Sequence, residues 1–314
     1  MINDIYGKTT INSPVIISLI KSKPLQRLKK ISQFGIPDKY YHLKNYSRYE
    51  HSVGVMILLK KLGASEEEQI AGLLHDVSHT AFSHVIDWVV GSGKTEDYQD
   101  NQHTTFILNS TIPQILQKYG YNANKISSYK HFGLLEQALP DICADRVDYS
   151  LREFKKEITK KCISSLINRN NKMAFADKST ALLFAKNFLK QQETHWGGFE
   201  AASRYRLFAD ALKIALTQKI ITMDDLWKTD SLVINKLEKS KDADIKKILK
   251  ALKHKSLKKY PKSKVVVHKK FRYVDPLFLK NGKLQRLSSF DFNFKAKIKK
   301  AKLENEKGVT IPLI

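Results

Sequence analysis

The sequence has few cysteines and no long apolar run, and both absences narrow the class of protein. Cys143 and Cys162 are the only cysteines among 314 residues, so the chain has neither a disulfide framework nor the spacing of a zinc finger. No stretch of about 18 apolar residues is present that could span a membrane. The first residues lack the charged start and apolar core of a secretory signal. We therefore expect a cytoplasmic protein with no membrane partner.

Acidic residues are scarce relative to basic ones. The chain contains 55 Lys and Arg against 31 Asp and Glu, which gives a formal net charge of +24. Residues 251–314 alone contain 18 Lys and Arg against 4 Asp and Glu, a net charge of +14. This C-terminal part can attract phosphates or nucleic acid, and it is equally compatible with a solvated lysine-rich surface.

Apolar spacing predicts helices over most of the first 250 residues. The expected helices cover residues 17–33 (broken at Pro24), 51–62, 66–75, 103–118, 124–136, 139–165, 179–192, 200–218 and 243–252, with a short one at Asp224-Asp225. Ser65 and Glu68 form a capping-box pattern before one of them. After Pro261, β-branched and aromatic residues predict strands at 264–268 and 271–275. We expect a mainly α protein with a helical core over residues 1–220 and a small basic α+β region over 221–314, packed on the core or appended to it.

The strongest chemical signal is the pair His75-Asp76, which follows an apolar helical run. His51 lies upstream and Asp145 lies downstream. Two imidazoles and two carboxylates suit a borderline divalent metal that keeps open positions for water and substrate. Adjacent residues point about 100° apart on a helix, so His75 and Asp76 can reach one metal only where the helix ends and the backbone turns.

Asp145 belongs to a series of polar residues at helical spacing. Asp141, Asp145, Asp148, Tyr149 and Arg152 fall along one helix face. Such a face opposite two histidines is what a metal site in a helical bundle requires. Asp141 and Asp148 are alternatives to Asp145 as the ligand. Each of these residues alone also fits an ordinary structural role, such as a salt bridge along the helix.

Four separated segments, Arg27–Gly35, Arg48–Val55, Ile70–Asp87 and Asp145–Glu153, together resemble the HD superfamily of metal-dependent phosphohydrolases. They are most similar to its dNTP triphosphohydrolases. The resemblance implies a helical HD-domain bundle with His51, His75, Asp76 and Asp145 as the metal ligands.

The same resemblance implies roles for further side chains. The implied catalytic residues are His79, His84 and Asp87, with Asp87 orienting His84. The implied substrate-binding residues are Gln33, Arg48, His103, Tyr149 and Arg152. The Glu that usually follows the residue at the His103 position is Thr104 here, and residues 41–47 replace the usual Pro-Gly loop, so the base preference is not predicted.

We therefore expect a metal-dependent nucleotide phosphohydrolase, with a dNTP as the leading substrate and deoxynucleoside and triphosphate as the products. A nucleotidase, phosphodiesterase or nuclease is an alternative within the enzyme class. A nucleic-acid-binding protein with a vestigial HD core is an alternative outside it. The expected cofactor is a divalent ion, Fe, Mn, Zn, Co or Ni, and Mg can accompany the triphosphate. The expected partners are the nucleotide substrate, further copies of the chain in a homo-oligomer, and nucleic acid at the basic C-terminal region.

Overall fold

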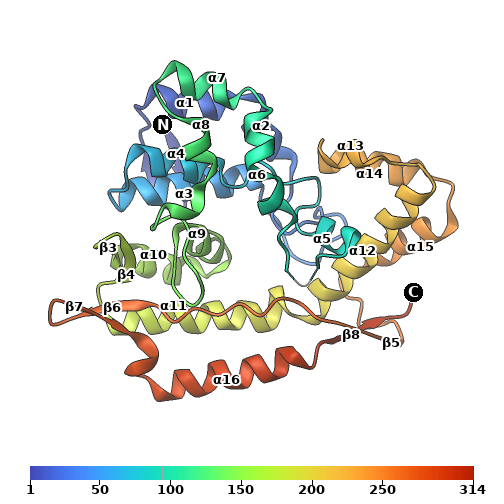
Figure 1. Ribbon diagram of the computed structural model, residues 1–314. Coiled ribbons are helices and arrows are strands. Elements are labelled where there is room, and N and C mark those ends of the chain that lie inside the picture. Colours follow the sequence, from blue (N-terminus) through green and yellow to red (C-terminus); the bar gives the residue numbers. More distant parts are fainter. Residues whose placement is uncertain (94) are drawn as a thin grey trace.

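Helices form most of the computed structural model, which describes residues 1–93 and 95–314 (Figure 1). The first half of the chain contains α1 (Pro14–Lys21), α2 (Lys23–Arg27), α3 (Arg48–Lys61), α4 (Glu66–Leu74), α5 (Val85–Val90), α6 (Tyr98–Leu108), α7 (Ile112–Lys118), α8 (Ala123–Ser127) and α9 (Ala144–Glu153). The second half contains α10 (Lys156–Ser165), α11 (Lys178–Gln191), α12 (Phe199–Thr217), α13 (Met223–Leu226), α14 (Asp230–Lys239), α15 (Ala243–Leu252) and α16 (Phe292–Glu306). Shorter turns are η1 (Leu28–Lys30), η2 (Tyr129–His131), η4 (Leu287–Ser289) and the π-helical turn η3 (Gln192–Trp196), which extends α11. The expected mainly α fold class is confirmed.

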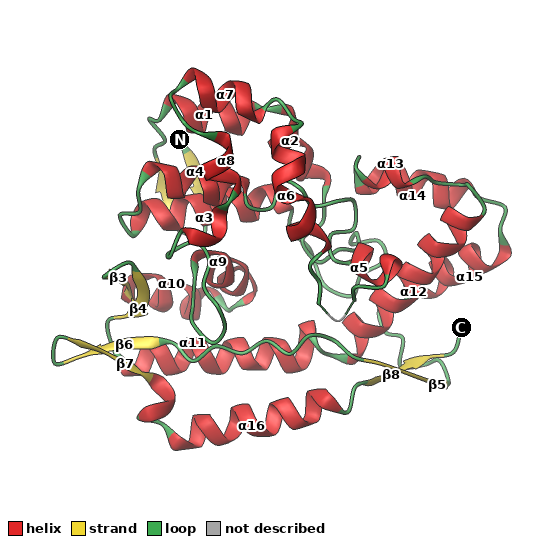
Figure 2. Ribbon diagram, in the orientation of Figure 1, coloured by secondary structure: helices red, strands yellow, loops and turns green. Residues whose placement is uncertain are grey.

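In the described ranges the strands form three small sheets, and Figure 2 shows these strands in yellow. The hairpin at the N-terminus pairs β1 (Ile2–Asp4) with β2 (Gly7–Thr9). A mixed sheet has the order β3 (Leu166–Arg169), β4 (Lys172–Phe175), β6 (Leu277–Lys280), β7 (Lys283–Arg286). A two-stranded ribbon pairs β5 (Lys262–Val267) with β8 (Val309–Pro312).

The mixed sheet joins segments that are far apart in sequence. β4 runs parallel to β6, with Ala174 opposite Leu277 and Phe175 opposite Phe278. α16 packs on α11, and β8 packs on α12 (Figure 1). The C-terminal residues therefore lie against the helical core, and a domain boundary at residue 220 stays a prediction.

Close packing of α3 on α4 fixes the geometry at the centre of the molecule. A Cβ atom at Gly72 in α4 would lie 2.4 Å from Leu59 Cδ1 in α3, so a larger residue at this position would displace the Leu59 side chain. α3 begins with a capping box in which Ser47 Oγ accepts from the Glu50 amide while the Glu50 carboxylate accepts from the Ser47 amide. The start of α3 is therefore well defined.

The capping box expected at Ser65 is only half formed. Ser65 Oγ accepts from the Glu68 amide, but the buried Glu68 carboxylate accepts from the amides of Leu134 and Leu135, at 2.7 and 3.0 Å. Glu68 thus fixes the loop that leads into α9 instead of capping its own helix.

Several expected elements differ in the structure. The helix expected over 139–165 is two helices, α9 and α10, because Phe154 and Lys155 adopt extended conformations. Helices α14 and α16 were not expected. Residues 271–275 do not form the expected strand: residues 268–275, called the strap below, are extended coil between β5 and β6. Within the described ranges, no helix is both long and apolar enough to cross a membrane.

Candidate active site

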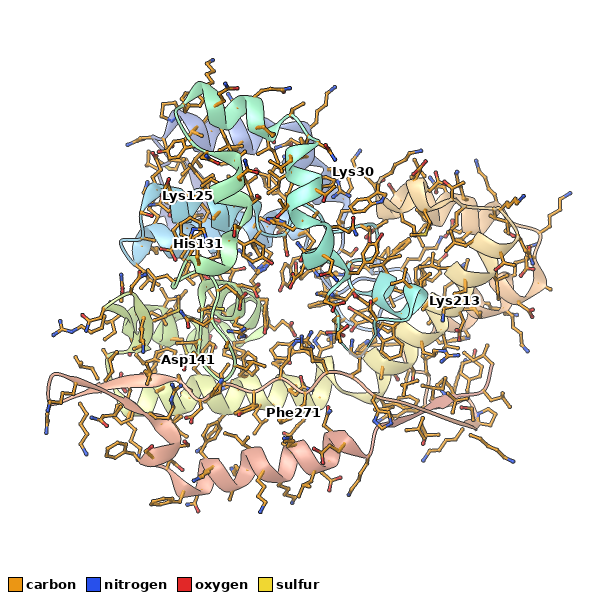
Figure 3. All side chains as sticks on the ribbon, viewed as in Figure 1. Lys30, Lys125, His131, Asp141, Lys213 and Phe271 are labelled. Atoms are coloured by element: carbon orange, nitrogen blue, oxygen red, sulfur yellow. The ribbon has the colours of Figure 1, made fainter. Side chains whose placement is uncertain are left out.

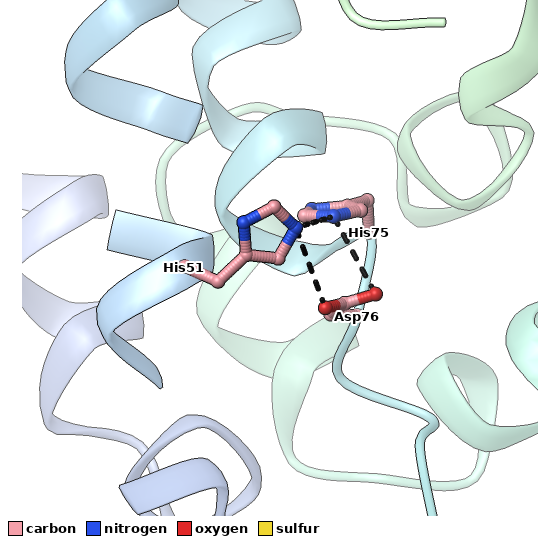
Figure 4. A group of neighbouring side chains, drawn as sticks. All are labelled: His51, His75 and Asp76. Carbon is pink, nitrogen blue, oxygen red and sulfur yellow. Dashed lines mark hydrogen bonds and ion pairs between the residues drawn. The ribbon is translucent and has the colours of Figure 1, made fainter. Parts of the chain in front are cut away.

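His51 and His75 meet where α3 begins and α4 ends (Figure 4). Both side chains are buried, and their Nε2 atoms are 3.2 Å apart. The backbone turns directly after His75, so Asp76 faces the same point, with Oδ1 3.4 Å from His75 Nε2 and Oδ2 3.7 Å from His51 Nε2. Because the helix ends here and the backbone turns, the adjacent side chains of His75 and Asp76 can both approach one ion.

Asp145 approaches this point from the first turn of α9. Its Oδ1 lies 2.9 Å from His51 Nε2 and 3.6 Å from His75 Nε2. The structure therefore brings together all four residues that the resemblance implied as metal ligands, although their role as ligands stays a prediction. Two imidazole nitrogens and two carboxylates form a donor set typical of a borderline divalent ion.

The outer nitrogen of each ring already has a partner. His51 Nδ1 lies 2.8 Å from Asp148 Oδ2, and His75 Nδ1 lies 2.7 Å from the carbonyl oxygen of Gly72. These bonds hold a hydrogen on each Nδ1, so each Nε2 can offer its lone pair to an ion at the centre. Two lone pairs at 3.2 Å repel each other unless a proton or a cation lies between them.

The pKa values of the cluster point the same way. Burial lowers the pKa of His75, but Asp76 and Asp145 outweigh it and raise this pKa to about 9. Burial would raise the pKa of Asp76, yet Arg48 and His75 hold it well below its ordinary value. The carboxylates are therefore ionised and favour positive charge beside them, and a divalent cation can take the place of the proton on His75.

Arg48 and His79 flank Asp76. Arg48 Nη1 donates to Asp76 Oδ2 at 2.7 Å, and Arg48 Nε donates to Ser83 Oγ at 3.0 Å. His79 Nε2 lies 3.2 Å from Asp76 Oδ1. Burial and the nearby Arg48 charge lower the pKa of His79 to about 3, so this imidazole is neutral. His79 therefore positions Asp76 without adding charge.

His84 and Asp87 form a second, separate pair. His84 Nδ1 lies 3.2 Å from Asp87 Oδ2, while Asp87 Oδ1 accepts from Ser92 Oγ at 2.9 Å and from the Tyr98 amide at 3.0 Å. The His84 ring contacts the His79 ring edge to face, with centroids 4.9 Å apart. Because the fixed Asp87 carboxylate binds Nδ1, the Nε2 atom of His84 remains for a ligand.

Arg27 binds the loop that contains His79 and His84. Its buried guanidinium donates to the carbonyl oxygens of Val77 and His79, at 2.9 and 2.6 Å, and to those of Trp227 and Lys228, at 3.0 to 3.2 Å. The loop is therefore tied to α13, from a distant part of the chain.

Asp230 holds the same loop from the N-terminus of α14. Its carboxylate oxygens accept from the amides of Phe82 and Ser32, each at 2.8 Å. Burial raises the pKa of Asp230 to about 6 despite these bonds. Phe82 and Ser83 both have positive φ, 65° and 48°, directly before His84.

A cavity of about 710 Å³ opens on the cluster. Its walls include Arg48, His75, Asp76, His79, His84, Asp145, Gln33 and Tyr149. Gln33 and Tyr149, expected near the sugar and base, thus share the cavity with the cluster, and their substrate contacts stay a prediction.

Arg152 does not have the expected position. It is absent from the described lining of the cavity, and its guanidinium binds Asp148 at 2.7 Å and Asp4 at 2.9 Å. A Cβ at Gly54 would lie 2.1 Å from Arg152 Nη2, so this glycine lets the pair approach α3. Arg152 thus supports Asp148, and Asp148 supports His51, while substrate binding by Arg152 stays a prediction.

His103 is also away from the cavity wall as far as the described residues define it. It is buried, and its Nδ1 lies 3.0 Å from Ser78 Oγ. The phosphate interaction expected of His103 therefore stays a prediction.

The two alternative ligands lie elsewhere. Asp148 faces the outer nitrogen of His51, and Asp141 pairs with Arg286. Glu136 and Cys143 lie near Asp145, but Arg146 Nη2 donates to Glu136 at 2.8 Å and burial raises the pKa of the Cys143 thiol. These positions do not suit a second cation.

The sequence motifs missed part of the cavity. Lys269, Lys270 and Arg272 of the strap line it, together with Glu96. At the other wall, Glu153 accepts from His195 Nδ1 at 2.6 Å, and His195 Nε2 lies 2.8 Å from the hydroxyl of Tyr41. The high positive charge of the C-terminal part was the one feature of the sequence that could have indicated a role for the strap in the cavity.

Comparisons with known proteins agree with this geometry. Residues 48–153, which hold the four cluster residues, match the HD domain family. The chain is 38% identical to the uncharacterized protein YdhJ of Bacillus subtilis, over 99% of this chain and 98% of that protein. A crystal structure of a hypothetical protein from Aquifex aeolicus has the same fold, with a TM-score of 0.63 and 18% identity over 96% of this chain and 98% of that chain.

Some of the relatives carry functional names. The metal-dependent phosphohydrolase cns2 of Cordyceps militaris is 37% identical over 52% of this chain and 49% of that protein. Human SAMHD1, a deoxynucleoside triphosphate triphosphohydrolase, is 34% identical over 28% of this chain and 16% of that protein. The chain spans half or less of these two proteins. Together with the buried cluster of histidines and carboxylates, the family match and the full-length relative show that the chain belongs to the HD-domain family of metal-dependent phosphohydrolases.

Proposed function

We propose that this protein hydrolyses deoxynucleoside triphosphates to deoxynucleoside and inorganic triphosphate. The observation that carries the proposal is a cavity lined by three of the four cluster residues, His75, Asp76 and Asp145, together with Arg48 and His84. The name of SAMHD1 supports the same substrate class. Gln33 and Tyr149 on the cavity wall provide polar groups beside the cluster for the nucleoside.

The reaction requires one bond to form and one to break at the α-phosphorus. The oxygen of water bonds to that phosphorus, the bond from phosphorus to the 5′ oxygen breaks, and a proton reaches the 5′ oxygen. A divalent ion held by His51, His75, Asp76 and Asp145 would supply a water of lowered pKa and polarise a phosphate oxygen.

Arg48 and His84 provide the remaining chemistry. Arg48 is fixed by Asp76 and Ser83, so it can donate to a phosphate oxygen without reorganising. His84 can give a proton from Nε2 to the 5′ oxygen while Asp87 stabilises the imidazole through Nδ1. His79 is neutral and bound to Asp76, so His84 is the better proton donor.

The test is hydrolysis of a dNTP in water enriched in heavy oxygen, with the products separated and weighed by mass spectrometry. We expect heavy oxygen in the triphosphate and none in the deoxynucleoside. Release of orthophosphate or diphosphate would contradict the proposal and favour another phosphohydrolase activity. The His75→Ala variant, which lacks one cluster residue, serves as the inactive control.

A further inference from the structure

We propose that the strap forms a subsite for the phosphates beyond the one under attack, and that Lys270 and Arg272 select polyphosphate over monophosphate ligands. The proposal rests on the proposed function as a nucleotide phosphohydrolase. It adds the residues that distinguish ligands by their number of phosphates.

The strap borders the same cavity as the cluster. Lys269, Lys270 and Arg272 line it alongside Arg48 and His84. Figure 1 shows the strap as the coil that runs between β5 and β6 in front of α11, and Figure 3 labels Phe271 on it, below the central opening. Arg272 and Arg48 therefore present two guanidinium groups to the same cavity.

Contacts from distant elements hold the strap in place. Asn305 of α16 donates to the carbonyl oxygen of Lys269 at 3.0 Å, and Gln192 of η3 donates to that of Lys270 at 3.3 Å. At the far end, the Asp275 amide donates to the carbonyl oxygen of Pro140 at 2.8 Å. These bonds fix the backbone of the strap beside the cavity.

The basic side chains of the strap outnumber their acidic partner. Glu96 pairs with Lys269 at 3.2 Å and also with Arg272. Lys269 is itself buried, and its Nζ lies 3.8 Å from the centroid of the Tyr205 ring. Glu96 is shared between Lys269 and Arg272, so it neutralises their two charges only in part.

Lys270 adds a further positive charge. It is exposed, and its Nζ donates to the carbonyl oxygen of Thr95 at 3.0 Å, which is a neutral partner. A polyphosphate carries several negative charges in a row, whereas a monophosphate at the cluster would leave the strap without an anion. Lys270 and Arg272 therefore favour ligands with more than one phosphate.

Binding of simple anions tests the subsite without turnover. Isothermal titration calorimetry of the metal-loaded protein compares inorganic triphosphate with orthophosphate, in the wild type and in Lys270→Gln and Arg272→Gln. We expect each variant to lose about 10- to 100-fold in affinity for triphosphate, as for a charge-assisted hydrogen bond, and less than about twofold for orthophosphate. Lys264→Gln, which removes an exposed charge from β5, should change neither affinity.

The controls separate charge from structure. Arg272→Lys keeps the positive charge and should recover part of the triphosphate affinity, which a purely structural role would not predict. Equal losses for both anions, or no loss in Lys270→Gln and Arg272→Gln, would overturn the subsite. If the protein binds triphosphate through the strap but does not hydrolyse dNTPs, the proposed function fails and the subsite stands.

Discussion

The carboxylate of Asp148 lies 2.8 Å from His51 Nδ1, on the side of the ring that faces away from the candidate metal position. Arg152 and Tyr6 bind the same carboxylate, at 2.7 and 2.9 Å, and fix its orientation. Asp148 therefore selects the form of His51 that can bind an ion through Nε2.

The first prediction concerns this supporting carboxylate. Asp148→Asn should lower metal affinity by about 10- to 100-fold, because an amide no longer holds the imidazole in the correct tautomer. Elemental analysis and metal titration measure the effect, with about one equivalent of divalent metal expected in the wild type. Asp141→Asn is the matched control, since Asp141 pairs with Arg286. Equal metal affinity in both variants would contradict the role of Asp148.

The second prediction separates proton transfer from metal binding. Asp87→Asn should reduce turnover by about two to four decades while metal content stays near normal. Asp87 also accepts a hydrogen bond from Ser92, so part of any effect could come from the loop that contains Ser92. Ser92→Ala removes that bond alone, and its turnover should remain close to the wild-type value. Unchanged turnover in Asp87→Asn would remove the pair from the reaction.

The third prediction concerns the pH dependence of stability. Burial raises the pKa of Glu96, but Arg272 and Lys269 outweigh it and hold this pKa well below its ordinary value. The Glu96 contribution to stability is thus present above the unfolded pKa of about 4.3 and is lost as the pH falls below it. Glu96→Gln should cost about 3 to 5 kcal/mol of unfolding free energy at neutral pH, because Lys269 and Arg272 lose their partner.

Chemical denaturation at several pH values tests this sign. The difference in unfolding free energy between the wild type and Glu96→Gln should shrink as the pH falls below about 4. A difference that stays constant from pH 7 to pH 3 would show that Glu96 does not act through its charge.

The fourth prediction concerns the basic face of α16. Lys295, Lys297, Lys299 and Lys300 are all exposed, and no aromatic residue lies among them. Phe294 is buried, which leaves Phe292 as the exposed aromatic before them. We expect the quadruple Lys→Gln variant to bind nucleic acid as the wild type does, since stacking platforms are absent within the cluster.

Binding measured across a range of salt concentrations distinguishes the two readings of α16. If the four lysines contact phosphates, the slope of log affinity against log salt should become shallower by up to about four in the variant. That outcome would overturn the prediction and revive the nucleic-acid-binding alternative.

The cluster itself could be predicted from the sequence because each of its residues lies in a short local motif. His75 and Asp76 are neighbours, and His51 and Asp145 lie in segments with their own recognisable patterns. Helix periodicity also placed Asp145, Asp148 and Arg152 on one face, but it could not say which of them faces the cavity. The structure resolves this: Asp145 faces the cluster, while Asp148 and Arg152 lie behind His51.

That the strap lines the cavity could not be predicted from the sequence in the same way. Lys269 and Glu96 are separated by 173 positions, and neither belongs to a pattern that would suggest a contact. The β-branched and aromatic residues near 271–275 favour a strand locally, but a strand also needs a neighbour for its backbone. Here the backbone of Lys269 and Lys270 binds side chains of Asn305 and Gln192, and the Asp275 amide binds the carbonyl oxygen of Pro140, so residues 268–275 are coil.

The left-handed backbone conformations of Phe82 and Ser83, directly before His84, lower the stability of the folded state, and interactions elsewhere must compensate for this strain. Phe82 and Ser83 each occupy a region that disfavours side chains, at a cost of about 1 to 3 kcal/mol per residue. Asp230 holds Phe82 there, and Ser83 contacts Arg48, so neither residue can relax without disturbing the active site. Selection for greater thermal tolerance would therefore meet resistance at this turn, and stabilising substitutions in this lineage should accumulate elsewhere in the chain.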